Sequence, residues 1–326
     1  MDFNLSDVQQ SWKSKAESLG RELPDGAPAG DVVMGAARVG LIDPQIDLLS
    51  AVVAVEAMAT ESAGAALAFA IHTSVVLSVS GDARFTALAR GETIAAVGLS
   101  SDDVASEHAG RLSGRASWVG PLTRGGVAVL GVRRAGAGDG LRTAVVVSLD
   151  EAGIEVEEVK TAALAGFVCG HLALNDVPFF EAGSPLPIMA RIRILLAAAG
   201  LGMGRRALRA ALRAAHSESY RGAGGEQTVQ GLLADAATEL DAATMLTWKA
   251  ATSAAPALAE ASMAKLAATE ATQRAVARAT QVVGADSFRR GHVVERLALD
   301  VRALELFAGR TEALREAVAE ATLPRG

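Results

Sequence analysis

Apolar residues recur at helical spacing through the first 91 residues of the chain. Val52, Val55 and Met58 lie three positions apart, which places their side chains on one face of a helix. A proline- and glycine-containing stretch at 24–28 interrupts this pattern and is typical of a loop between two helices. The spacing predicts a helical N-terminal domain over residues 1–91.

The pattern changes to short β-branched runs after residue 91. These runs lie at 93–97, 126–130, 143–147 and 154–159. Glycine-rich turns separate them, as in a sheet built from hairpins. In the last run Ile154, Val156 and Val159 stand against glutamates, which indicates one solvated face. We predict a middle antiparallel β domain over residues 92–182.

Long alanine-, leucine- and arginine-rich stretches fill the remainder of the chain. The predicted helices are Ile188–Ser217, Gln227–Ala250, Pro256–Val283 and Val293–Ala321. Four long helices with short connections predict a C-terminal four-helix bundle over residues 183–326. The fold class is therefore α+β, without the β-α alternation of a doubly wound nucleotide-binding fold.

Composition and charge narrow the functional classes. Hydrophobic residues make up 50% of the 326 residues, which is enough for a substantial core. Lys and Arg number 31 against 37 Asp and Glu, a net charge of −6 that argues against nucleic-acid binding. The single cysteine, Cys169, excludes a disulfide framework, and the scattered histidines predict no metal site. Charged residues interrupt the apolar stretch 51–79, and no signal peptide is recognisable, so we expect a cytoplasmic protein with no membrane span.

Several motifs follow one another in the order found in the acyl-CoA dehydrogenase family, whose domain order this chain resembles. The matching stretches are Leu112-Ser113-Gly114 with Trp118-Val119, Leu174 to Pro178, Glu226 to Asp235, Gln281 to Gly284, and Val294-Glu295-Arg296 with Asp300. The resemblance covers nearly the whole chain. It implies an FAD-dependent oxidoreductase that oxidises an acyl-CoA thioester at its α and β carbons.

The same resemblance implies which residues meet the ligands. Ser100 would supply a hydroxyl to the flavin, and Trp118 would present its ring to the flavin. Gln281 and Gly284 belong to the segment whose backbone meets the adenine end of FAD, and Arg193 would contact the substrate. Trp118 could equally be an ordinary core tryptophan, since most buried tryptophans on strands are.

The residues that carry the family's chemistry are missing at several positions. The segment that normally holds the catalytic carboxylate has Ala308 at that position, and the alternative position before Arg193 is Ile192. Gly120 replaces the threonine that reaches the flavin N5 edge, and Glu218 stands where a cation normally meets the cofactor pyrophosphate. No catalytic residue is therefore assigned.

These losses favour a subunit that joins a flavin-bearing homologue and shares or contacts its FAD. Related site-poor subunits act on bulky acyl-CoA substrates such as sterol side chains, which makes that substrate class an analogy. Two alternatives stay open. The chain could be a self-sufficient dehydrogenase, a dimer or tetramer of itself, that uses Glu305 or Glu312 as its base. It could also be a flavin-free homologue that binds an acyl thioester.

Two other features have simpler interpretations than ligand binding. Gly200-Leu201-Gly202-Met203-Gly204 superficially resembles a nucleotide-binding loop, but no strand precedes it, so close helix packing is the better interpretation. Arg205, Arg206, Arg209 and Arg213 form a basic stripe. We interpret this stripe as a solvated or ion-paired face, with a contact to a phosphate of CoA or FAD as the alternative.

Overall fold

The computed structural model describes residues 4–79, 82–99, 105–134, 142–216, 226–253 and 255–323. The N-terminal part is helical, as predicted. Its helices are α1 (Asp7–Glu22), α2 (Ala29–Arg38), α3 (Leu48–Ala59), α4 (Ala63–Ser78), η1 (Ala83–Phe85) and α5 (Thr86–Ala89). Ser6 begins α1 with a capping box, since its side chain accepts from the Gln9 amide and the Gln9 side chain accepts from the Ser6 amide.

Helix α4 is the connection from these helices to the sheet. Most of its residues are buried, so the helix is apolar around its whole circumference rather than along one stripe. Its one histidine, His72, lies 3.1 Å through Nε2 from the Leu88 carbonyl oxygen and accepts from the Ala95 amide at 3.3 Å through Nδ1. Burial lowers the pKa of His72 to about 4, so it is a neutral structural link.

The middle part of the chain forms one eight-stranded sheet. The strands are β1 (Ala95–Gly98), β2 (Ala105–His108), β3 (Arg111–Val119), β4 (Val127–Arg134), β5 (Arg142–Ser148), β6 (Ile154–Val159), β7 (Cys169–Val177) and β8 (Phe180–Gly183). Their order is β6-β7-β3-β2-β4-β5-β8, with β1 beside β4. The sheet is mainly antiparallel, as predicted, except that β1 and β2 both run parallel to β4. Parallel neighbours need longer connections than a hairpin turn, and here the chain returns to β4 only after β3.

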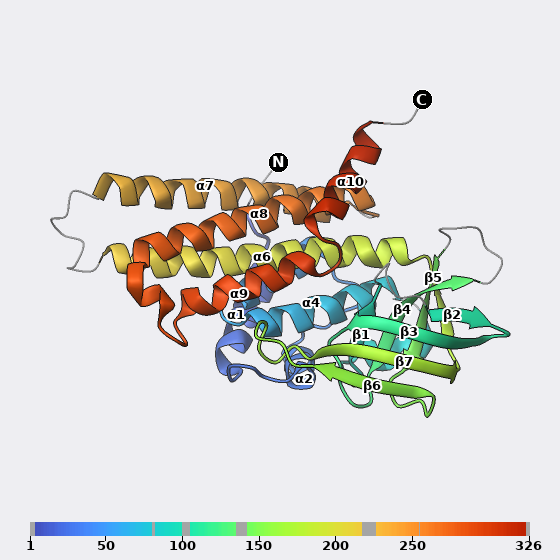
Figure 1. Ribbon diagram of the computed structural model, residues 1–326. Helices are drawn as coiled ribbons and strands as arrows, with labels where there is room; N and C mark the ends of the chain where they lie inside the picture. The colour runs from blue at the N-terminus through green and yellow to red at the C-terminus, as the bar shows by residue number, and fades with distance from the viewer. Residues whose placement is uncertain are drawn as a thin grey trace.

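The C-terminal part is a helical bundle with one break that was not predicted. Its elements are α6 (Pro185–Ala215), α7 (Glu226–Ala251), α8 (Leu258–Val283), η3 (Gly284–Phe288), α9 (Val293–Leu306) and α10 (Thr311–Thr322). The predicted single helix 293–321 is therefore two helices. Ala308 and Gly309 have φ values of +55° and +111°, which no α-helix can include. In Figure 1, α6, α7 and α8 run side by side, and α10 turns away from them.

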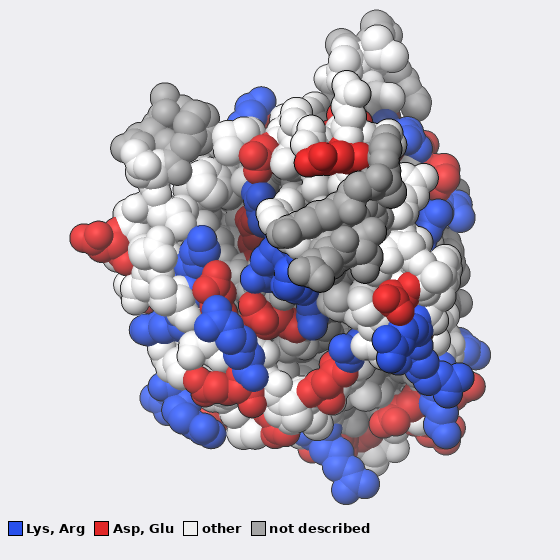
Figure 2. Space-filling model, turned by 90° about the vertical axis from the view of Figure 1, so that its left-hand side faces the viewer, with Lys and Arg blue, Asp and Glu red and all other residues white. Residues whose placement is uncertain are grey.

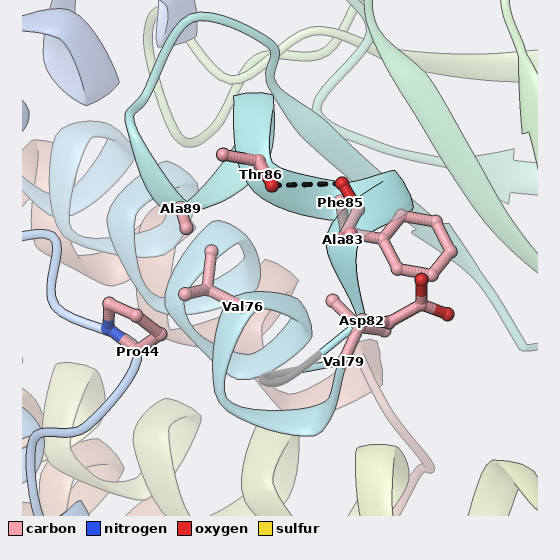
Figure 3. A pocket seen from close by; sticks show the side chains of 8 residues that line it. All are labelled: Pro44, Val76, Val79, Asp82, Ala83, Phe85, Thr86 and Ala89. Atoms are coloured by element: carbon pink, nitrogen blue, oxygen red, sulfur yellow. Dashed lines mark hydrogen bonds between the residues drawn. The ribbon is translucent and has the colours of Figure 1, made fainter.

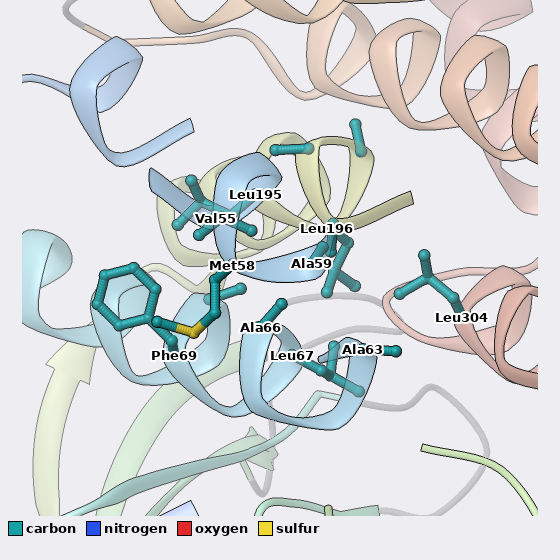
Figure 4. Close-up of a cluster of buried hydrophobic side chains, with 14 of the residues drawn as sticks. Val55, Met58, Ala59, Ala63, Ala66, Leu67, Phe69, Leu195, Leu196 and Leu304 are labelled. Carbon is teal, nitrogen blue, oxygen red and sulfur yellow. The ribbon is translucent and has the colours of Figure 1, made fainter. Parts of the chain in front are cut away.

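The N-terminal helices and the bundle share one core. Figure 4 shows Val55, Met58 and Phe69 from α3 and α4 against Leu195 and Leu196 of α6, and all of these side chains are buried. Full burial of one such side chain stabilises the fold by about 1.5–3 kcal/mol. Within the described residues, α6 is the helix long and apolar enough to cross a membrane, but 78% of its apolar window is buried, as in a bundle core.

Candidate functional site

The loop between α9 and α10 places Ala308, the residue at the carboxylate position, beside the first and third bundle helices. Its carbonyl oxygen accepts a hydrogen bond of 2.9 Å from Arg193 Nε on α6. Arg193 is only 8% exposed, and its Nη1 also donates to Ser262 Oγ on α8 at 2.6 Å. The predicted substrate contact of Arg193 stays a prediction, because the structure shows this guanidinium bound to its own chain.

Lys265 on α8 holds the same loop and was not singled out from the sequence. Its side chain is fully buried, and Nζ donates to the carbonyl oxygens of Glu305, Phe307 and Gly309. An ammonium group has three donors, so each finds an acceptor at the C-terminal end of α9, where the helix dipole favours a cation. Burial, and then the charge of Arg193, lower the pKa of Lys265 to about 7. The sequence feature that could have identified Lys265 is a lysine surrounded by alanines on the apolar face of a predicted helix.

The carboxylates considered as substitute bases are not placed for that role. The Glu305 carboxylate accepts from Thr311 Oγ1 at 2.8 Å, Gln273 Nε2 at 2.7 Å and Arg302 Nη1 at 3.1 Å. Partial burial would raise the pKa of Glu305, but these hydrogen bonds outweigh it and lower the pKa. A carboxylate so bound and acidified is a poor proton acceptor. Glu312 is exposed beside Arg310, at 3.9 Å.

Ile192, the other candidate position, is an apolar core residue. It is 1% exposed within α6, and its side chain has no group that could accept a proton. Both positions at which the family resemblance implies a base therefore lack one. The loop that would present the base is nevertheless held in place by two buried cations.

Trp118 lies at the end of β3 and is not a core residue. Its side chain is 52% exposed, and its φ of +55° is unusual for a bulky residue. The indole packs edge-on against the His171 ring of β7, with ring centroids 5.6 Å apart. The exposed ring is available to a ligand or a partner, and its predicted contact with a flavin stays a prediction.

Gly120 exchanges two backbone hydrogen bonds with Val97. The space above its Cα is filled by Phe167. A Cβ atom at position 120 would lie 2.9 Å from Phe167 Cε1, closer than real side chains approach, and 3.2 Å from Cys169 Cβ, tighter than most real contacts. A threonine at this position would require the Phe167 ring to move.

The region between Gly120 and Ala308 contains two aromatic rings. Phe167 is 3% exposed and meets Phe307 edge-to-face, with ring centroids 5.4 Å apart. In the family that the sequence resembles, the flavin ring and the reacting carbons would lie between these two positions. The residues present do not fit a flavin ring at this place.

The remaining predicted cofactor residues lie elsewhere. Gln281 is exposed at the end of α8, and Gly284 follows it with φ +71°. This end of the bundle is remote from the sheet and from the α9–α10 loop (Figure 1). The structure therefore does not bring Gln281 and Gly284 together with Trp118 in one chain. Ser100 and Glu218 lie outside the described residues.

Two arginines of the basic stripe on α6, Arg205 and Arg209, are ion-paired. Arg205 Nε lies 2.5 Å from Glu56 and its Nη1 lies 3.1 Å from Asp241, while Arg209 lies 3.7 Å from Glu61. Figure 2 shows Lys and Arg interleaved with Asp and Glu on the visible face rather than gathered into a patch of one sign. For Arg205 and Arg209 this supports the ion-paired interpretation over a phosphate contact.

An apolar pocket of about 330 Å³ was not foreseen. Figure 3 shows it between the C-terminal end of α4 and the η1–α5 turn. Its lining residues are Pro44, Val76, Val79, Asp82, Ala83, Phe85, Thr86 and Ala89. Asp82, its one charged residue, is paired with Arg84 at 2.6 Å. The pocket includes neither Trp118 nor Ala308. In the described parts of the chain, no three His, Cys, Asp or Glu side chains could together hold a metal ion.

Comparison with known sequences identifies the helical bundle. The family model for the acyl-CoA dehydrogenase C-terminal domain matches residues 187–323. The bovine mitochondrial short-chain specific acyl-CoA dehydrogenase is 37% identical over 132 residues, which cover 39% of this chain and 32% of that enzyme. The 3-sulfinopropanoyl-CoA desulfinase of Paraburkholderia xenovorans is 37% identical over 95 residues, 28% of this chain and 24% of that protein. The matches thus span about a third or less of these relatives.

Comparison with solved structures covers the whole fold. Butyryl-CoA dehydrogenase from Megasphaera elsdenii superposes with a TM-score of 0.87 at 20% identity, over 99% of this chain and 100% of that chain. Glutaryl-CoA dehydrogenase from Mycobacterium smegmatis gives 0.85 at 18% identity, over 99% and 96%. The FAD complex of PigA gives 0.86 at 19% identity, over all of both chains. The helical bundle therefore matches the acyl-CoA dehydrogenase C-terminal domain, and the whole chain shares the fold of these solved structures.

Proposed function

We propose that this chain is the site-poor partner subunit of a cytoplasmic hetero-oligomer that carries out FAD-dependent α,β-dehydrogenation of an acyl-CoA thioester. The observation that carries the proposal is Ala308. The loop that would present a carboxylate is held by Arg193 and Lys265, but no carboxylate stands on it. The chain has thus kept the loop that would present the base while lacking the proton acceptor itself.

The missing base matters because the reaction begins by removing a proton from the α carbon of the thioester. A general base must lie within hydrogen-bond reach of that proton and have a suitable pKa. An alanine methyl group accepts no proton. Glu305, one turn earlier, is occupied by three hydrogen-bond donors. A homologous subunit with an intact loop would therefore supply the base, and its own FAD would take the hydride.

The exposed end of the bundle supports an assembly. Phe288 is 76% exposed, and Arg289 and Arg290 beside it are also exposed. An exposed aromatic residue with two arginines suits an interface that also meets a phosphate group. We place the partner's cofactor at this end, close to Gln281 and Gly284.

The test is to purify the chain alone and co-expressed with a flavin-bearing acyl-CoA dehydrogenase homologue. Native mass spectrometry gives the subunit ratio, the visible spectrum gives flavin per chain, and an artificial electron acceptor reports acyl-CoA oxidation. We expect no oxidation by the chain alone, and a complex with fewer flavins than subunits. Oxidation by the isolated chain with one flavin per chain would instead establish a self-sufficient enzyme.

A pair of variants tests the placement of the partner's cofactor. Arg289→Ala with Arg290→Ala should lower the flavin content of the complex without unfolding either subunit, since both side chains are exposed. Arg90→Ala is the matched control, because its side chain is 67% exposed on the N-terminal part of the chain. Equal flavin content in both variants would contradict this placement.

A further inference from the structure

Two phenylalanines from segments far apart in the sequence meet at the junction of the sheet and the bundle. Phe167 lies just before β7, and Phe307 lies between α9 and α10. Their rings are 5.4 Å apart and nearly perpendicular, at 87°, the edge-to-face geometry that aromatic pairs prefer. We call this pair the aromatic plug.

The backbone holds the plug from the side of the sheet. The Phe167 amide donates to the Leu164 carbonyl oxygen at 2.9 Å, which closes a tight turn. The Leu164 amide in turn donates to Asp300 Oδ1 of α9 at 2.6 Å. Leu164 itself is 3% exposed. The turn that carries Phe167 is therefore attached directly to the bundle.

The backbone also holds the plug from the side of the bundle. Lys265 Nζ donates to the Phe307 carbonyl oxygen, and Arg193 Nε donates to that of Ala308. Both cations are buried, so breaking these bonds would leave unpaired polar groups in the core. Phe307 thus has a fixed position against Phe167.

The surrounding residues are adapted to the plug. Gly120 is the residue type that leaves room for the Phe167 ring, since any Cβ there would come within 2.9 Å of it. Trp118, Leu164 and Ala308 all have φ values between +55° and +57°, although none is glycine. Such conformations cost free energy and persist where surrounding packing determines them. Three of them border this junction.

We infer that the aromatic plug takes the place of a flavin ring, so that this chain joins its sheet to its bundle without a cofactor and admits no flavin ring at its own site. The inference rests on the proposed function, because it explains how a partner subunit without its own flavin keeps the family's fold. Besides the absence of a base, it gives a second reason why this chain would not carry out the reaction alone, because the space for the flavin ring is filled.

The first experiment is thermal unfolding of the full chain with and without saturating FAD, with ADP as the control ligand. We expect FAD to raise the melting temperature no more than ADP does, since only the adenine end can bind. A larger shift with FAD than with ADP, together with a perturbed flavin spectrum, overturns the inference.

The second experiment measures the coupling within the plug. Phe167→Leu, Phe307→Leu and the double variant are compared by chemical unfolding, since leucine keeps a buried apolar side chain and favours folding. We expect the double variant to lose less stability than the sum of the single losses, because contacting residues couple. Phe85→Leu, a buried phenylalanine away from the junction, should be additive with Phe307→Leu. Additive losses for Phe167 and Phe307 overturn the inference.

These results separate the plug from the partner role. A chain that takes up a flavin ring yet still assembles with a homologue overturns the plug alone. A chain that excludes the ring but assembles with no homologue supports the plug and overturns the partner role.

Discussion

Ala308 stands in a left-handed backbone conformation, and this allows a direct test of the loop geometry. An alanine at φ +55° pays a steric cost that glycine avoids, while glycine loses more backbone entropy on folding. We expect Ala308→Gly to raise the free energy of unfolding by about 0.5 kcal/mol. Ala298→Gly, at an exposed position inside α9, should lower it by about 1 kcal/mol. The same sign for both substitutions in chemical unfolding would contradict the loop conformation.

Lys265 predicts a pH dependence of stability. Its pKa falls from 10.5 in the unfolded chain to about 7 in the folded chain, mainly through burial. Between these values the unfolded chain binds the proton that the folded chain releases. The free energy of unfolding should therefore rise with pH from about 7 upward, by at most about 1.4 kcal/mol per pH unit. Below pH 7 both states are protonated, and this contribution is constant.

The matched variant for that measurement is Lys265→Met, which keeps the length of the side chain. It should lose the rise above pH 7 and should also be destabilised by about 3 kcal/mol at neutral pH, because buried carbonyl oxygens lose their donor. Lys249→Met, at an exposed position on α7, should change neither quantity. Parallel pH curves for the wild-type chain and Lys265→Met would show that Lys265 does not titrate in this range.

At the scale of elements, hydrophobic periodicity predicts the bounds of helices well, but it fails where a contact between distant parts of the chain determines where a helix ends. The predicted helix Gln227–Ala250 differs from α7 by one residue at each end, and the predicted strand 154–159 coincides with β6. The break after Leu306 was not predicted, because alanine and phenylalanine are compatible with a helix. Its conformation depends on Lys265, about forty positions earlier in the chain. The local sequence around Leu306 contains no information on a hydrogen-bond donor so far away in the chain.

The pairing of α7 with α8 includes an ion cluster that acid should weaken. Glu239 of α7 accepts from Arg278 at 2.8 and 2.9 Å and from Arg274 at 2.7 Å. Hydrogen bonds, first from Arg278, outweigh partial burial and lower the pKa of Glu239 from 4.5 to about 2. The resulting stability is present above pH 4.5 and is lost as pH falls toward 2.

Glu239→Gln tests this cluster. Because Glu239 and Arg274 are partly exposed, we expect a loss of about 1 kcal/mol at neutral pH and a smaller further loss on acidification than in the wild-type chain. Urea unfolding at several pH values measures both. Glu316→Gln, at an exposed position on α10, should behave like the wild-type chain. If Glu239→Gln left the loss of stability at low pH unchanged, that loss would have to come from other titratable groups.

At the scale of the whole molecule, the candidate site combines what sequence can and cannot reveal. The empty base positions Ala308 and Ile192 follow from motif register alone, because they require only residue identity. The filling of the site by Phe167 does not, since it depends on which side chain faces Gly120 across the junction. The separation of Trp118 from Gln281 likewise depends on where the bundle ends in space (Figure 1). The type of residue at a motif position can be read from the sequence itself, whereas which residues lie close together depends on the fold.

Restoring the carboxylate tests whether the missing base or the filled flavin space prevents this chain from oxidising acyl-CoA. Ala308→Glu supplies the missing base, but the aromatic plug stays between that position and Gly120. We therefore expect no acyl-CoA oxidation by Ala308→Glu alone, even with added FAD, and the same melting temperature as for Ala308→Gln, which matches its size without being a base. If Ala308→Glu oxidised acyl-CoA with added FAD and Ala308→Gln did not, the base alone would have been missing. Because a base acts only on a substrate held beside an electron acceptor, the plug makes inactivity the expected result.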